Sequence, residues 1–190
     1  MLNPFSNRAF SIILLLVFIS FFSFSPLSAY ERRRAHLQIK KSGDAGQYAV
    51  PLAAALISLA HRDYEGMKFY AGSFSATMGA AYAIKPLINA KRPISGRMSF
   101  PSGHTAAAMG AAAYMQMRYG MAYGIPCYVL ASYVGFSRVY AQKHWFRDVL
   151  GATAIAMAAN AFFTKPFSEN YQLIPQLERD RAGICVRWEW

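Results

Sequence analysis

The sequence predicts an all-α, polytopic membrane protein with six transmembrane helices and a functional site at one membrane face. Of its 190 residues, 55% are hydrophobic, and long apolar segments alternate with short polar ones. Small residues also recur at four-residue spacing, as in Gly72, Ala76 and Ala80. A spanning helix needs about 20 mostly apolar residues, and regularly spaced small residues let helices in lipid pack closely.

Residues 9–29 form the first apolar stretch, which follows Arg8. The stretch is long enough to span a bilayer and longer than the apolar core of a usual signal peptide, so we expect an uncleaved first helix. The tetrapeptide PLSA before Tyr30 resembles a signal-peptidase site, which leaves a cleaved signal peptide as the alternative. In both cases the chain that follows is directed across the membrane.

The remaining helices are expected at the later apolar segments. A basic stretch and a turn at residues 42–46 (SGDAG) separate the first helix from the second. The five further helices are expected at residues 48–60, 67–84, 102–118, 121–138 and 144–163. Residues 1–167 are therefore predicted to form the transmembrane domain. Residues 168–190 are predicted to form a polar tail, whose end is either a short strand or an interfacial anchor.

The formal net charge of +11 fits the same class of protein. Long apolar runs argue against a nucleic-acid-binding protein, whereas cations at the anionic surface of a bilayer account for the charge. The expected partner is thus the membrane bilayer, with no nucleic acid, and the sequence does not specify an oligomeric state. Cys127 and Cys185 are isolated from each other, so we expect free thiols and no metal site.

The alternation of six helices brings three polar clusters to one membrane face. The third helix ends near Lys85 and the fourth begins near His104, while the fifth ends near Arg138 and the sixth begins near His144. This arrangement holds whichever way the chain is inserted. Ionisable residues at membrane depth usually have functional roles.

The first cluster contains Lys85 and Arg92, joined by a turn-prone segment that ends at Pro93. An arginine grips two phosphate oxygens at once, and a lysine supplies a compact charge. The pair is therefore a candidate phosphate site. The alternative is that both cations reach to the interface from a helix end.

The second cluster comprises Pro101, Ser102, Gly103 and His104, directly before an alanine-rich helix. Backbone amides at a helix N-terminus bind anions, and His104 in the first turn would face such an anion. The alternative is simple N-capping by Ser102 beside an interfacial histidine.

The third cluster contains Arg138, His144 and Asp148. His144 and Asp148 are four residues apart and share one face of a helix. The carboxylate then fixes the tautomer of the imidazole and leaves its other nitrogen free as a nucleophile or base. Taken alone, this cluster is better explained as a surface His–Asp pair.

Together the clusters supply what phosphoryl transfer requires: cations and amides for the phosphate oxygens, a nucleophile and an acid. The expected site loops contain a single carboxylate, that of Asp148, and no acidic cluster for a divalent metal. We therefore expect metal-independent chemistry without a cofactor.

Three motifs carry a family resemblance: Lys-x6-Arg-Pro at 85–93, Pro-Ser-Gly-His at 101–104, and Ser-Arg-x5-His-x3-Asp at 137–148. This pattern resembles the type 2 phosphatidic acid phosphatase (PAP2) superfamily, and every motif position is filled. The resemblance implies six transmembrane helices and hydrolysis of a phosphoric monoester. The compact length and the stretch at 123–145 are most similar to bacterial lipid A phosphatases.

The resemblance also implies a role for each motif residue. His144 would attack phosphorus and form a phosphohistidine, Asp148 would orient His144, and His104 would protonate the leaving oxygen. The phosphate would be held by Lys85, Arg92, Ser102, Gly103 and Arg138.

The expected partner of this site is a phosphorylated lipid. The preferred candidate is lipid A, from which the 1- or the 4'-phosphate would be removed. Undecaprenyl diphosphate, phosphatidylglycerophosphate and phosphatidic acid are the alternative substrates. A non-catalytic membrane protein that binds anionic lipid is an alternative of another class. Further cations in the site loops suit a multiply charged head group: Lys91, Arg97, Lys143 and Arg147.

The expected location is the bacterial inner membrane, with the active site facing the periplasm as the related enzymes imply. With the N-terminus inside, this orientation puts more Lys and Arg outside than inside, contrary to the usual bias. Phosphate chemistry accounts for the cations in the site loops, but not for those at 32–41.

Overall fold

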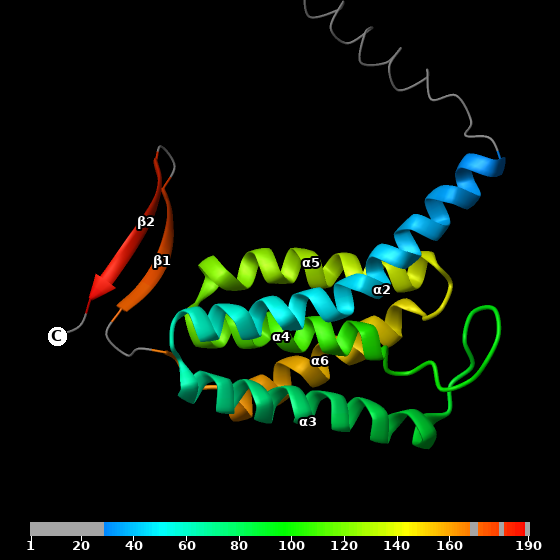
Figure 1. Cartoon of the computed structure of the whole chain (residues 1–190), viewed down its shortest axis with the longest axis horizontal. Coiled ribbons are helices and arrows are strands. Elements are labelled where there is room, and N and C mark those ends of the chain that lie inside the picture. The colour runs from blue at the N-terminus through cyan, green and yellow to red at the C-terminus, as the bar shows by residue number, and fades with distance from the viewer. Residues whose placement is uncertain (1–28, 168–170, 179–180, 189–190) are drawn as a thin grey trace, which may run out of the picture. The chain divides into compact units, whose positions relative to one another are not determined.

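The structure is a computed structural model that describes residues 29–167, 171–178 and 181–188. This part of the chain forms five helices followed by a two-stranded sheet (Figure 1). The elements are α2 (Ala29–Ala60), α3 (Tyr64–Ile88), α4 (Gly103–Tyr119), α5 (Met121–Tyr140), α6 (Phe146–Phe163), β1 (Tyr171–Glu178) and β2 (Arg181–Trp188). The chain divides into the units Met1–Ala35 and His36–Trp190, and every contact described below lies within the second.

The helices from α3 to α6 confirm the predicted helices and shift only their ends. The shifted helix end that matters most for the site is the start of α6. This helix begins at Phe146, so His144 lies in the loop before the helix and not in its first turn. The predicted first helix at residues 9–29, and the question of its cleavage, lie outside the described residues.

The predicted turn at residues 42–46 is wrong, because α2 continues through this segment as a helix. Its two glycines instead let α2 approach α5 closely. A Cβ atom on Gly43 would lie 2.5 Å from Nη2 of Arg138, and one on Gly46 would lie 2.6 Å from Cγ2 of Val134. The glycines therefore serve helix packing, and their propensity for turns is overridden by that contact.

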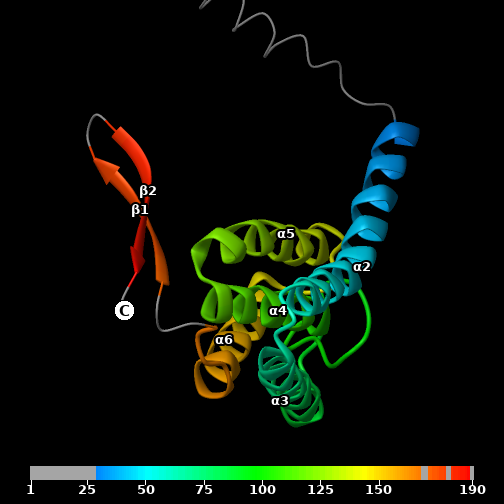
Figure 2. The ribbon, with the colours of Figure 1, turned by 60° about the vertical axis from the view of Figure 1, so that its left-hand side comes forward.

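The central helix of the bundle is α4, which packs against α3, α5 and α6 (Figure 2). Its buried side chains are mostly alanines, at positions 106–108 and 111–113. A Cβ atom on Gly110 would lie only 3.4 Å from Cγ2 of Thr77 on α3. The predicted use of small residues at helix contacts is thereby confirmed for α4.

Large apolar side chains lie on the outside of the bundle. Leu52, Val129 and Phe162 are 60%, 65% and 83% exposed, while the buried core consists mainly of alanine. This distribution is the reverse of that in most soluble helix bundles, where the large apolar side chains fill the core.

Among the helices of the described residues, none combines the length and the mean hydropathy expected of a helix that crosses a membrane. The prediction of six transmembrane helices is therefore not confirmed.

A buried ion pair closes the end of the bundle where α4 ends and α3 begins. Arg118 donates from Nε and Nη2 to the carboxylate of Asp63, at 2.7 and 2.6 Å. Its Nη1 donates to the backbone carbonyls of Lys165 and Pro166, at 3.0 and 2.8 Å. Because each charge is compensated, the pair fixes the chain that follows α6 to the α2–α3 turn.

The tail forms an antiparallel hairpin in which Tyr171 pairs with Trp188 and Glu178 with Arg181. The helices bear out the all-α prediction for the body of the chain. Of the two alternatives for the end of the tail, the strand agrees with the structure. The division into a domain at 1–167 and a tail at 168–190 stays a prediction.

We predict that Gly43→Ala destabilises the protein, because its Cβ would collide with Ser137 and Arg138 on α5. Overpacking of this kind costs about 1–3 kcal/mol. Gly79→Ala is the matched control, since a Cβ there meets nothing within 4 Å and alanine favours a helix. Thermal unfolding of the two full-length variants tests this, and a Gly43→Ala variant as stable as Gly79→Ala would contradict it.

Candidate active site

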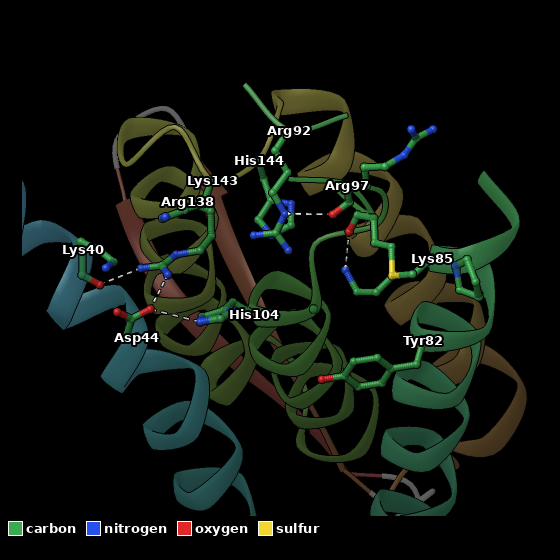
Figure 3. Close-up of a pocket in the computed structure, with 13 residues that line it drawn as sticks. Lys40, Asp44, Tyr82, Lys85, Arg92, Arg97, His104, Arg138, Lys143 and His144 are labelled. Carbon is green, nitrogen blue, oxygen red and sulfur yellow. Dashed lines mark hydrogen bonds and ion pairs between the residues drawn. The ribbon is translucent and has the colours of Figure 1, made fainter. Parts of the chain in front are cut away.

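A cavity of about 600 Å³ opens where α3 and α5 end and α4 begins, beside the middle of α2 (Figure 3). It brings together residues from all three predicted clusters, as the alternation of helices predicted. The lining residues are Lys40, Asp44, Tyr82, Lys85, Pro86, Arg92, Arg97, Met98, Gly103, His104, Arg138, Lys143 and His144.

His144 lies on the cavity wall with Asp148 behind it. Nδ1 of the imidazole is 3.4 Å from Oδ2 of Asp148, whose side chain is fully buried. The same oxygen accepts hydrogen bonds from the hydroxyl of Ser99 and, at 2.9 Å, from the amide of Trp145. The predicted His–Asp pair is therefore present, and its carboxylate is oriented by two donors of its own.

The imidazole of His144 is buried among cations, which determines its protonation. Burial, followed by the charges of Lys85 and Arg92, lowers the pKa of His144 to about 4, although Asp148 opposes this. His144 is consequently neutral at physiological pH. A neutral imidazole whose Nδ1 faces a carboxylate has its Nε2 lone pair free to react.

Lys85 and Arg92 enter the cavity from the end of α3 and from the loop that follows it. Nζ of Lys85 donates to the carbonyl of Pro101 at 2.6 Å and to that of Met98 at 3.3 Å. Nε of Arg92 donates to the carbonyl of Arg97 at 3.2 Å. These bonds hold the 89–102 loop over the N-terminus of α4 and fix both cations at the cavity.

The start of α4 places Gly103 and His104 in the cavity lining. Ser102 is the N-cap of α4: its hydroxyl oxygen is 3.4 Å from the amide of Thr105, and its own amide donates to the carbonyl of Asp148 at 3.0 Å. The side chain of Ser102 is not part of the cavity lining, so its contact with phosphate stays a prediction.

Arg138 extends from α5 towards α2 and is almost completely buried. Its Nη1 donates to Oδ1 of Asp44, its Nη2 to the carbonyl of Lys40 at 2.7 Å, and its Nε to the hydroxyl of Ser137 at 3.0 Å. Nε2 of His104 lies 3.1 Å from the same oxygen of Asp44. A carboxylate therefore joins these two groups of the cavity lining (Figure 3).

The sequence did not identify Asp44, Lys40 or Ser99 as site residues. Asp44 and Lys40 were assigned to a turn and to a basic stretch, but a continuous α2 places them one helical turn apart. Two of the four additional predicted cations, Arg97 and Lys143, line the cavity, whereas Lys91 and Arg147 do not.

The sequence matches the PAP2 superfamily over residues 9–171. With the relatives described next, this match makes the protein a phosphatase, that is, a phosphoric monoester hydrolase. The chain belongs to the PAP2 superfamily, and the resemblance of its three motifs is thereby confirmed.

Two relatives act on lipid A. A lipid A 4'-phosphatase of Helicobacter pylori is 27% identical over 170 residues, which cover 80% of this chain and 85% of that protein. A lipid A 1-phosphatase of Porphyromonas gingivalis is 30% identical over 157 residues, which cover 72% of this chain and 35% of that protein. Among solved structures, LpxE of Aquifex aeolicus shares the fold with a TM-score of 0.58 at 22% identity, over 67% of this chain and 83% of that one.

We predict that Ser99→Ala lowers kcat for lipid-phosphate hydrolysis about tenfold and leaves KM nearly unchanged, because a hydrogen bond that orients Asp148 is lost. Ser73→Ala is the matched control, since Ser73 is also fully buried but bonds to the carbonyl of Tyr70 within α3. Steady-state kinetics would contradict the prediction if both variants lost the same activity.

Proposed function

We propose that the protein removes a phosphate from the head group of a membrane lipid through a phosphohistidine on His144. The observation that carries this proposal is the pairing of a neutral His144 with the buried Asp148 on the wall of a cation-lined cavity. Membership of a phosphatase superfamily supports the same chemistry.

In the proposed first step, Nε2 of His144 attacks phosphorus and the bond from phosphorus to the lipid oxygen breaks. His104 gives its proton to the leaving oxygen, so the lipid departs as an alcohol. Asp148 holds Nδ1 and stabilises the charge that develops on the imidazole. In the second step, His104 takes a proton from water, which attacks the phosphohistidine and releases inorganic phosphate.

Lys85, Arg92 and Arg138 are proposed to bind the non-bridging phosphate oxygens, together with the Gly103 amide and Ser102. These cations would stabilise the charge of the transition state without a metal ion or another cofactor. Their hydrogen bonds to backbone carbonyls favour such a role, because the cations themselves then need to move little when the phosphate binds.

The bilayer is the proposed environment of the helix bundle. Exposed Leu, Val and Phe side chains around an alanine-rich core suit lipid, where the tails solvate large apolar groups and close packing joins the helices. A location in the bacterial inner membrane, with the cavity facing the periplasm, agrees with a lipid head group as the substrate.

Lipid A is the proposed substrate. Both lipid A phosphatases among the relatives favour it, and so do the cations of the cavity beyond the three of the motifs. Lys40, Arg97 and Lys143 add positive charge to the cavity lining, which suits a head group with a second phosphate. Undecaprenyl diphosphate, phosphatidylglycerophosphate and phosphatidic acid are the alternative substrates.

We predict that His144→Ala lowers phosphate release at least about a thousandfold, because no other group replaces the nucleophile, and leaves binding to anionic lipid vesicles intact. His61→Ala is the control, since His61 stacks on Tyr119 beside the buried ion pair. Mass spectrometry of lipid A incubated with the wild type identifies whether the 1- or the 4'-phosphate is lost. A wild type that binds anionic lipid but hydrolyses no lipid phosphate would be a non-catalytic lipid-binding protein.

The low pKa of His144 predicts the pH below which protonation of its imidazole stops the reaction. The nucleophile must be neutral, so its contribution to kcat/KM is complete above about pH 5 and is lost as the pH falls through about 4. Nitrogen NMR of the imidazole, assigned by comparison with His144→Gln, measures this directly. A titration near 6.5, the ordinary value for histidine, would contradict the prediction.

A further inference from the structure

Among the described residues that line the cavity, Asp44 is the one carboxylate. Its position is unexpected, because a negative charge in a phosphate site repels the substrate. The three PAP2 motifs do not include α2, so their roles give Asp44 no function. Its contacts, however, are with two residues of those motifs.

Asp44 contacts two of the groups that are proposed to act on the substrate phosphate. A single atom, Oδ1, accepts a hydrogen bond from Nη1 of Arg138 and lies 3.1 Å from Nε2 of His104. Arg138 is the proposed clamp for a phosphate oxygen and His104 the proposed acid for the leaving oxygen. A substrate phosphate that bonded Nη1 of Arg138 through one oxygen and Nε2 of His104 through another would therefore have to replace Oδ1 at both atoms (Figure 3).

We propose that Asp44 is a further positioning residue of the phosphate site: an internal anion that holds Arg138 and His104 in place in the empty cavity and is exchanged for the substrate phosphate. This inference rests on the proposed function, because it takes Arg138 and His104 as groups that bind phosphate. It assigns to α2 a role in substrate affinity.

Two features of α2 make the exchange feasible. The side chain of Asp44 is 41% exposed, so it can turn away from the cavity, whereas that of Arg138 is 3% exposed. Lys40 lies one turn earlier on the same face of α2 and also lines the cavity. A displaced Asp44 can therefore pair with Lys40, so its charge is not left without a partner.

The exchange affects both the binding of the substrate and the release of the product phosphate. In the empty site, Asp44 keeps the buried guanidinium of Arg138 compensated and oriented. Every anion must compete with this tethered carboxylate, so the affinity for phosphate is lower than the cations alone would give. Product phosphate is displaced by the same carboxylate, which favours its release.

The test is the affinity of the full-length protein in detergent for inorganic phosphate, measured by calorimetry. Asp44→Asn keeps the shape of the side chain and removes its charge, so we expect phosphate to bind about tenfold more tightly. Asp44→Ser provides a second uncharged variant, and Asp44→Glu should restore the weaker binding of the wild type. Glu65→Gln removes an equally negative but distant carboxylate at the start of α3 and should leave the affinity unchanged.

Equal or weaker phosphate binding by both Asp44→Asn and Asp44→Ser overturns the proposal. So does an equal gain in Glu65→Gln, because the effect would then be one of net charge alone. These affinities do not depend on turnover. A wild type that releases no phosphate from lipids would contradict the proposed function, whereas unchanged phosphate affinity in an active enzyme would contradict only the role of Asp44.

Discussion

The site depends on the hydrogen bonds that compensate the buried carboxylate of Asp148. A charge removed from water must be compensated by hydrogen bonds, and Asp148 obtains them from Ser99 and from the amide of Trp145. Its backbone carbonyl also accepts from the amide of Ser102. One residue thus joins the 89–102 loop, the start of α4 and the start of α6. The contacts of Asp148 therefore join two segments that are distant in sequence, one at 99–102 and one at 145–148.

The two oxygens of this carboxylate have different surroundings. Among the residues that the structure describes, Oδ1 of Asp148 is buried and has no hydrogen-bond partner, and Nε of Arg147 lies 3.9 Å away. Its partner His144 is neutral, because burial and nearby cations oppose its protonation. Phosphoryl transfer would place a positive charge on this imidazole, and only then would Asp148 gain a full ion pair. Under the proposed mechanism, the electrostatic compensation of Asp148 would therefore be greatest after the reaction has begun.

Much of this arrangement was predictable from the sequence, for reasons that are local. Apolar segments define α3 to α6, and the alternation of helices brings Lys85, His104, Arg138 and His144 to one end. Contacts between distant segments were not predictable. SGDAG has the composition of a turn, but close packing on α5 makes it helical. A helix was expected only from residue 48, so its continuation through Asp44, and with it the approach of Asp44 to Arg138, was not predicted.

The close contact between α2 and α5 at the glycines also brings residues from outside the three motifs to the cavity. The groups proposed for the chemical steps lie on α3 to α6 and in their loops, within motifs that the superfamily shares. Asp44 and Lys40 reach the same cavity from a helix that carries none of those motifs. Substitutions on α2 can therefore alter which phosphate is accepted while the reacting groups stay constant. The lining that α2 contributes is thus the part of this cavity that can vary without a change in any motif residue.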